Sequence, residues 1–375
     1  MRYVNYFIIV MLLTACRGSQ TPSAEAGGDS VTFKYATQLS VVRYDGYAVA
    51  SLKNPWKEGM TLHRYVLVPS DQELPPHLPN GTIIRTPVRK AVMFTTVHCA
   101  MLMEFGLEDR ISGVADLKYI KIPWVQQKVR EGRIADVGEG MSPVIEKIID
   151  QRPDVLFLSP FENSGGYGKL EDIDIPIVEC AEYMEPSPLA RAEWIRFYGM
   201  LFGCEKRADS LFNVTDSSYQ ALKSIARTAK KNPSVLLDKI TGSVWYVPGG
   251  KSTIGQMVQD AGGTNPWSAD EHSGSISLPF ETVLEKGSEA DVWMFRYSGD
   301  HDITYDELLS DHHGYSQFKA WRNHEAYGCN VEQGPFYEET PFHPDWLLSD
   351  FISILHPEIK GLRPQRYFKK VVTSP

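Results

Sequence analysis

The chain has 375 residues, which is more than one ordinary domain of roughly 100–200 residues and suits two. Hydrophobic residues make up 42% and charged residues 23%, a composition typical of globular proteins and not of disordered or fibrous ones. The net charge of -9 argues against nucleic-acid binding, because phosphate backbones attract basic surfaces, and no apolar run beyond the N-terminus is long enough for an integral transporter.

The first sixteen residues have the pattern of a secretory signal. A basic start, Met1-Arg2, precedes an apolar run over residues 6–13, and residues 13–16 (Leu-Thr-Ala-Cys) resemble the bacterial lipobox. This resemblance predicts a signal peptide over residues 1–15, a lipid on Cys16 and a flexible polar tether over residues 16–30. An uncut membrane anchor and a plain secreted protein are the alternatives, but the run is short for a span of about 20 residues.

Four cysteines besides Cys16 belong to the body of the protein: Cys99, Cys180, Cys204 and Cys329. Their wide and irregular spacing excludes a zinc finger and does not suggest a dense disulfide scaffold. One or two disulfide bridges are compatible with an oxidising compartment, and the sequence does not decide between bridges and free thiols.

Residues 31–186 are predicted to form an N-terminal lobe that begins with a β elaboration. Residues 39–52 read as a hairpin around Asp45-Gly46, and residues 65–68 add another strand. From residue 91 strands alternate with helices: strands over 91–95, 110–114, 155–158 and 175–178, a helix that ends at Gly106, and a second helix opened by Ser142 as N-cap and Pro143. This alternation predicts a largely parallel sheet.

A long helical stretch over residues 187–231 connects this lobe to a second one. It contains no proline after Pro188 and one break near Gly203, so it is expected to act as a rigid strut. Residues 232–375 repeat the earlier order, with strands over 234–237 and 244–247 and a helix over 254–261. The predicted fold is therefore α/β, with two Rossmann-like lobes that enclose a cleft, since ligands of open α/β sheets bind at the carboxyl ends of the strands.

Two glutamates occupy equivalent positions in the two halves. Glu146 and Glu281 each follow a proline at the start of a helix that leads into an apolar strand. Both are predicted to lie on the exposed side of their helix, away from its apolar stripe.

From about residue 91 to 364 the chain resembles the solute-binding proteins of bacterial ABC importers for iron–siderophore, haem and cobalamin. The resemblance rests on the order of several weak motifs, at residues 106–114, 143–155, 192–203, 248–252 and 260–265. It implies that Glu146 and Glu281 dock onto the membrane permease; an ordinary solvated glutamate near a helix N-terminus is the alternative. The hairpin region before residue 90 is not part of the usual pattern and is expected to alter one rim of the cleft.

The expected ligand-binding side chains follow the predicted strands. Aromatic faces suit flat or greasy chelates, and basic groups neutralise their carboxylates or catecholates. Trp245 and Phe161 are as consistent with a buried core as with a cleft. The candidates are Ser159, Phe161, Glu162, Trp245, Tyr246, Lys251, Arg296, Tyr297 and Tyr337.

Histidines offer a second kind of site. His301, His312 and His313 lie among several carboxylates and could hold zinc or manganese, although such a stretch between a strand and a helix is more often a solvated loop. His98 follows the first strand of the lobe, where an imidazole that points into the cleft would suit haem iron.

Together with these observations, the resemblance implies a monomeric, lipid-anchored periplasmic binding protein that needs no cofactor and delivers a metal chelate or corrinoid to an ABC permease–ATPase complex. A carrier of free zinc or manganese with the same fold is the alternative. A hydrolase is a weaker one, because the sequence contains no Gly-x-Ser-x-Gly elbow, His-Glu-x-x-His helix or Cys–His signature.

Overall fold

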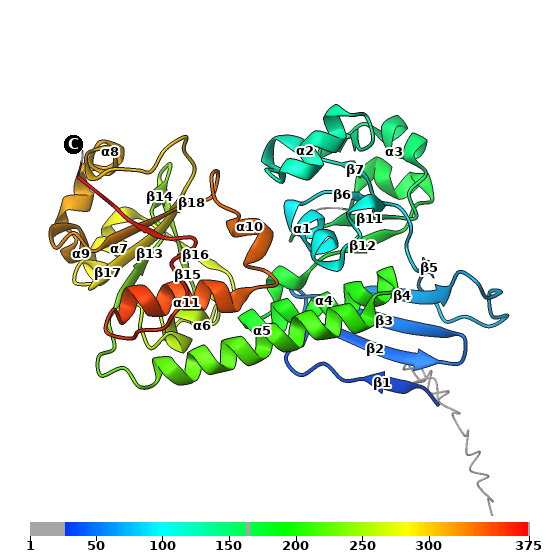
Figure 1. The fold of residues 1–375 in the computed structure, drawn as a ribbon, viewed down its shortest axis with the longest axis horizontal. Coiled ribbons are helices and arrows are strands. Elements are labelled where there is room, and N and C mark those ends of the chain that lie inside the picture. The colour runs from blue at the N-terminus through cyan, green and yellow to red at the C-terminus, as the bar shows by residue number, and fades with distance from the viewer. Residues whose placement is uncertain (1–26, 163–165, 374–375) are drawn as a thin grey trace, which may run out of the picture.

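The computed structural model describes residues 27–162 and 166–373 (Figure 1). The predicted signal peptide, Cys16 and most of the predicted tether lie outside the described residues. Two lobes stand side by side over a pair of long helices, with an additional sheet beside the N-terminal lobe (Figure 1). In these two ranges none of the helices has the length and apolar character that a membrane crossing requires.

The additional sheet confirms the predicted hairpin. Leu39 pairs with Leu52 and Tyr44 with Tyr47 across a turn in which Gly46 has a φ of 80°, a conformation that glycine adopts without strain. All neighbouring strands are antiparallel except the last two, which are parallel. In spatial order the strands are β1 (Asp29–Val31), β2 (Leu39–Tyr44), β3 (Tyr47–Lys53), β4 (Thr61–Pro69) and β5 (Thr82–Thr86).

Two buried carboxylates tie this sheet to the rest of the molecule. Glu193 accepts hydrogen bonds from the backbone N–H groups of Lys34 and Tyr35, both at 2.7 Å. Glu185 accepts from the N–H of Gln38 at 2.9 Å and from the indole of Trp194 at 2.8 Å. Because each carboxylate satisfies several backbone donors, the segment before β2 is held firmly against helix α4 (Pro188–Phe202).

The N-terminal lobe contains the predicted parallel sheet, in the order β12-β11-β6-β7-β8. Its helix α1 ends at Gly106, whose φ of 70° gives the left-handed C-cap that the sequence predicts. The elements are β6 (Ala91–Met93), α1 (Thr96–Phe105), β7 (Ile111–Val114), α2 (Pro123–Arg130), β8 (Ala135–Asp136), β9 (Gly138–Glu139), β10 (Ser142–Pro143), α3 (Ile145–Gln151), β11 (Val155–Leu158) and β12 (Ile177–Glu179).

The prediction that Ser142 and Pro143 open a helix is wrong. Ser142 pairs with Glu139 and Pro143 with Gly138 in a short antiparallel ribbon, and α3 begins only at Ile145. The two residues that resemble a helix start therefore belong to a tight antiparallel turn over residues 138–143.

The connecting segment consists of two helices, as predicted. α4 ends at Gly203, which has a φ of 68°, and α5 (Glu205–Ala226) continues beyond this break. α4 is buried along almost its whole length in the core of the N-terminal lobe, whereas α5 packs on α11 (Pro344–Leu355) of the other lobe. The helices thus belong to both lobes and brace them (Figure 1).

The C-terminal lobe repeats the plan imperfectly. β13, β17 and β18 are parallel, and β19 joins them antiparallel. β15, predicted as one more strand of the repeat, lies in a separate antiparallel sheet between β14 and β16. The elements are β13 (Val235–Leu237), β14 (Ile240–Thr241), β15 (Val244–Pro248), α6 (Thr253–Asp260), β16 (Ser275–Leu278), α7 (Phe280–Gly287), β17 (Val292–Tyr297), α8 (Tyr305–Asp311), α9 (Lys319–Arg322), β18 (Ala326–Asn330), α10 (Phe336–Glu339), α11 and β19 (Lys369–Lys370).

The four cysteines of the described residues are all free thiols, so none of the disulfide bridges that the sequence left open is present among them. Cys99, Cys180 and Cys329 are buried, and Cys204 is half-buried.

Candidate ligand-binding groove

A cavity of about 300 Å³ lies where the connecting helices meet the C-terminal lobe. Tyr183, Pro188 and Arg191 line it from the N-terminal side, and Arg296 and Tyr337 line it from the C-terminal lobe. We call this cavity the inter-lobe groove. Residues 27–90 contribute nothing to its lining, so the additional sheet does not form a rim of this groove as the sequence led us to expect.

Arg191 is the unusual residue of the groove. It lies at the end of the first turn of α4, which Ser187 caps and Pro188 opens, and a helix N-terminus disfavours positive charge. Its Nε atom is buried without a partner, and within the described part of the chain its guanidinium makes no hydrogen bond or close ion pair. Burial lowers the pKa of Arg191, and the nearby Glu182 only partly offsets this. An anionic ligand would supply the missing partner.

Arg296 lies at the end of β17 and is held differently. Its Nε and Nη2 atoms contact the two carboxylate oxygens of Asp238 at 2.9 and 2.6 Å, a bidentate pair. Burial by itself lowers the pKa of Arg296, but the interaction with Asp238 has a larger effect and raises this pKa. The guanidinium also lies over the ring of Phe336, 5.9 Å from its centroid.

A second cavity, of about 890 Å³, extends along the C-terminal lobe and shares Arg296 and Tyr337 with the inter-lobe groove. Tyr297 lines it, as does His301, which is paired with Asp300 and Glu307 at 2.6 Å each. Three of the predicted ligand-binding residues, Arg296, Tyr297 and Tyr337, are therefore brought together.

A third cavity, of about 560 Å³, belongs to the N-terminal lobe. Phe161 lines it together with Met141 and Tyr167, and 46% of the Phe161 side chain is exposed. Ser159 is half-buried and Glu162 is exposed, and neither lines any of the three cavities.

The prediction that Trp245 binds ligand is wrong. Its side chain is completely buried, and its indole N–H donates to the carbonyl oxygen of Leu237 at 2.9 Å. Alternation along β15 explains this, because it turns Trp245 into the core and leaves 47% of Tyr246 exposed. Lys251 is exposed and pairs with Glu271 at 3.2 Å, and neither it nor Tyr246 lines the three cavities.

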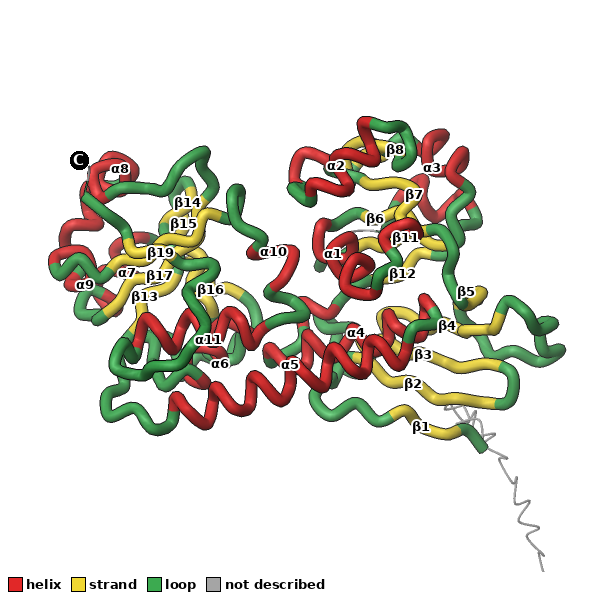
Figure 2. The backbone as a smooth tube through the Cα atoms, viewed as in Figure 1, coloured by secondary structure: helices red, strands yellow, loops and turns green. Residues whose placement is uncertain are grey.

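Polar contacts join the lobes across the gap, one of them between Glu104 of α1 and His343, whose Oε1 and Nε2 atoms lie 3.4 Å apart. The hydroxyl of Thr96, at the start of α1, donates to Glu338 of α10 at 2.8 Å, and Lys121 lies 3.6 Å from Glu332. Figure 2 shows α10 reaching from the C-terminal lobe toward α1. The lobes thus already touch, and opening them requires breaking these contacts.

The histidines do not form the metal site that the sequence allowed. His312 packs on Phe280 with ring centroids 4.0 Å apart, and His313 is exposed. His98 does not point into a cleft but is completely buried inside the N-terminal lobe. Among the described residues, the one group of three potential metal ligands is His98, Cys180 and Glu182.

Glu146 and Glu281 are exposed, in the first turns of α3 and α7. Across the described ranges neither carboxylate takes part in a hydrogen bond or an ion pair. Both are free to meet a basic partner.

Residues 93–331 match the family model described as periplasmic binding protein, which is more than half of the chain. The protein therefore belongs to the periplasmic binding protein family. The parallel strands at the centre of each lobe agree with this membership.

Several known proteins resemble the chain. It is 27% identical over 363 residues to a lipoprotein of Methanocaldococcus jannaschii, covering 90% of this chain and 84% of that one. It is 29% identical over 209 residues to the petrobactin-binding protein of Bacillus subtilis, covering 54% of this chain and 62% of that one. Among solved structures, a periplasmic haem-binding protein of Pseudomonas aeruginosa superposes with a TM-score of 0.59 at 17% identity, covering 76% of this chain and all of that one.

Proposed function

We propose that this protein captures an anionic metal chelate in the inter-lobe groove and delivers it to an ABC importer. The observation that carries the proposal is Arg191, a half-buried cation without a counter-ion, which faces the same cavity as Arg296. Catecholate and carboxylate siderophores and the propionates of haem carry negative charge that could pair with Arg191. The exposed aromatic ring of Tyr337 offers a face for a flat chelate.

The names of the relatives support a metal chelate as the ligand. One is named for binding petrobactin, and the superposed structures include haem-binding and vitamin B12-binding proteins. A corrinoid is the ligand class that the arginines favour least, since cyanocobalamin has no net charge. A carrier of free zinc or manganese is not favoured, because the groove lining contains no histidine, cysteine or carboxylate.

Binding to defined chelates tests the proposal. We would titrate the purified protein with a ferric tris-catecholate complex, ferric citrate, haem and cyanocobalamin, and follow tryptophan fluorescence and chelate absorbance. We expect one equivalent of an anionic iron chelate or of haem to bind, and more weakly as salt increases. Binding of cyanocobalamin alone, or of none of the four, would contradict the proposal.

The location follows from the same proposal. The lipobox-like residues 13–16 and the relatives named as lipoproteins support a lipid on Cys16 and a site of action outside the cytoplasm, beside the membrane. Mass spectrometry of the mature N-terminus tests this, since a Cys16→Ser chain should carry no lipid.

We further propose that Glu146 and Glu281 contact basic pockets on the permease. They are exposed, unpaired and placed one on each lobe. The double variant Glu146→Ala and Glu281→Ala should bind the chelate normally but lose most uptake in cells. The double variant Glu285→Ala and Asp150→Ala, which removes two exposed carboxylates from the same helices, is the matched control. Unchanged uptake in the first variant would contradict the proposed docking role of Glu146 and Glu281.

A further inference from the structure

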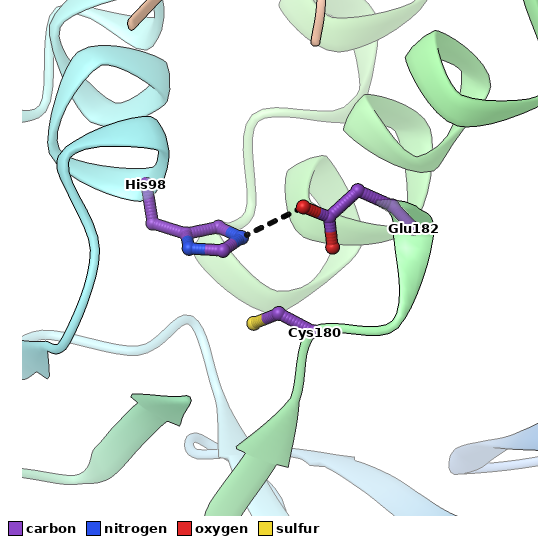
Figure 3. A group of neighbouring side chains, drawn as sticks. All are labelled: His98, Cys180 and Glu182. Carbon is purple, nitrogen blue, oxygen red and sulfur yellow. Dashed lines mark ion pairs between the residues drawn. The ribbon is translucent and has the colours of Figure 1, made fainter. Parts of the chain in front are cut away.

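A polar cluster lies inside the N-terminal lobe, apart from all three cavities. His98 projects from α1, Cys180 directly follows β12, and Glu182 lies in the turn after it (Figure 3). The three side chains are at most 2% exposed, and one potential ligand atom from each lies within 4.8 Å of the others. None of the three residues lines the inter-lobe groove.

The imidazole of His98 is fixed but incompletely bonded. Its Nδ1 atom contacts the hydroxyl of Thr95 at 2.6 Å, and its ring packs against Phe157 and Tyr198. Its Nε2 atom is buried without a hydrogen-bond partner and lies 3.7 Å from Oε1 of Glu182. A buried polar atom of this kind destabilises the fold unless something else satisfies it.

The other two groups are oriented toward the same point. The Tyr198 hydroxyl donates to Oε2 of Glu182 at 2.9 Å, which leaves Oε1 directed at His98. The sulfur of Cys180 lies below the His98–Glu182 pair in Figure 3, and its thiol donates to the carbonyl oxygen of Val178 at 3.4 Å. A single ion among the three would satisfy the orphaned Nε2 atom.

We infer that His98 Nε2, Cys180 Sγ and Glu182 Oε1 form a buried site for a divalent transition metal of the zinc class. A nitrogen, a sulfur and an oxygen ligand suit zinc, and an imidazole whose other nitrogen is hydrogen-bonded is the usual form of a metal-binding histidine. On binding, the Cys180 thiol releases its proton to solvent. The thiolate and the carboxylate then balance the two positive charges of the ion.

The geometry requires only a small adjustment. With metal–ligand bonds of about 2.0–2.3 Å, neighbouring ligand atoms of a tetrahedral zinc ion lie about 3.3–3.8 Å apart. The His98–Glu182 separation of 3.7 Å already falls in this range, so Cys180 is the side chain that has to move inward. Since the cluster joins α1 to the end of β12, we expect the metal to stabilise the N-terminal lobe and not to act as transported cargo.

Cobalt substitution tests this site. The full-length protein would be unfolded and refolded anaerobically with Co²⁺ in the absence of any chelate, because the cluster is buried. We expect one cobalt ion per chain and a thiolate-to-cobalt charge-transfer band in the near ultraviolet. The inter-lobe groove contains no cysteine, so this band cannot come from a metal held there, and it should persist in Arg191→Ala.

Cysteine variants supply the controls. Cys180→Ser and His98→Gln should each abolish or shift the band, whereas Cys99→Ser, which changes a buried cysteine next to His98, should keep it. Zn²⁺ should raise the melting temperature of the wild type relative to EDTA but leave that of Cys180→Ser unchanged. The absence of bound cobalt in the refolded wild type, or a band that survives in Cys180→Ser, would overturn the site even if a variant failed to fold.

Discussion

The two arginines of the inter-lobe groove are held in opposite ways. Arg296 comes from the end of a strand and is neutralised by a bidentate contact with Asp238, whereas Arg191 comes from a helix N-terminus and has no such partner. A paired arginine mainly maintains the shape of the cavity that it lines, because its charge is already neutralised. An unpaired one is poised to bind, because a ligand gains the whole interaction.

Arg191→Ala should therefore give the largest loss of chelate binding. We expect about a 30–150-fold weaker affinity, which corresponds to about 2–3 kcal/mol for one charge-assisted hydrogen bond. The free energy of unfolding should not fall, since the change removes a half-buried cation that has no close ion-pair partner and whose charge the nearby Glu182 only partly offsets. Isothermal titration calorimetry and urea unfolding measure the two effects.

Arg191→Lys is the matched control, because it retains the charge but loses the planar fork, and it should bind with intermediate affinity. If Arg191→Ala bound the chelate with the affinity of the wild type, Arg191 would not be the ligand-binding arginine of the groove.

Compared with Arg191→Ala, Arg296→Ala should weaken chelate binding less and lower the free energy of unfolding more. Chelate affinity should fall by about threefold to tenfold, because Asp238 already satisfies most of the donors. The free energy of unfolding should fall by about 1–2 kcal/mol, a value reduced for solvent screening since 34% of the Arg296 side chain is exposed.

The double change Arg296→Ala and Asp238→Ala sharpens this point. It removes both charges and should restore part of the lost stability. If Arg296→Ala instead lost as much affinity as Arg191→Ala with no loss of stability, both arginines would be ligand-binding groups of the same kind.

The smallest expected effect is the contribution of His301, on the wall of the larger cavity, to the pH dependence of stability. Glu307 and then Asp300 raise the pKa of His301 above its ordinary value of 6.5, and the same pairing lowers the pKa of Glu307 to about 2. Since the folded-state pKa of His301 is raised, its contribution to stability is complete below pH 6.5 and is lost as the pH rises through the folded-state value.

An NMR titration of the His301 ring measures this directly. Glu307→Gln should return the pKa of His301 toward 6.5, because it removes the negative charge that contributes most to the raised value. A His301 pKa at or below 6.5 in the wild type would contradict the pairing.

The features that the sequence predicted correctly depend on local chemistry. Asp45-Gly46 required a tight turn, and Gly106 and Gly203 ended their helices in the left-handed conformation that favours glycine. The alternation of strands and helices likewise required a parallel sheet in each lobe.

The features that the sequence missed depend on where a side chain points. Trp245 was a ligand candidate because its aromatic side chain belongs to a predicted strand and its following loop, with a core position as the alternative, and the pairing of β15 faces it inward. Arg191 was overlooked because it stands in an otherwise apolar helix start, Pro188-Leu-Ala-Arg-Ala, where it resembles an ordinary surface charge. A lone arginine in the first turn of such a helix is the signal that could have marked it.

The sequence by itself determined the two-lobed α/β plan, the helical brace and the equivalent positions of Glu146 and Glu281, because periodicity, turn residues and caps act over a few neighbours. Only the tertiary structure decided which charges remain unpaired in the groove and that His98, Cys180 and Glu182 meet in the core. Those outcomes depend on segments far apart in the chain, 58 residues for Arg296 and Asp238 and about 80 for His98 and Cys180, and no local pattern encodes such contacts.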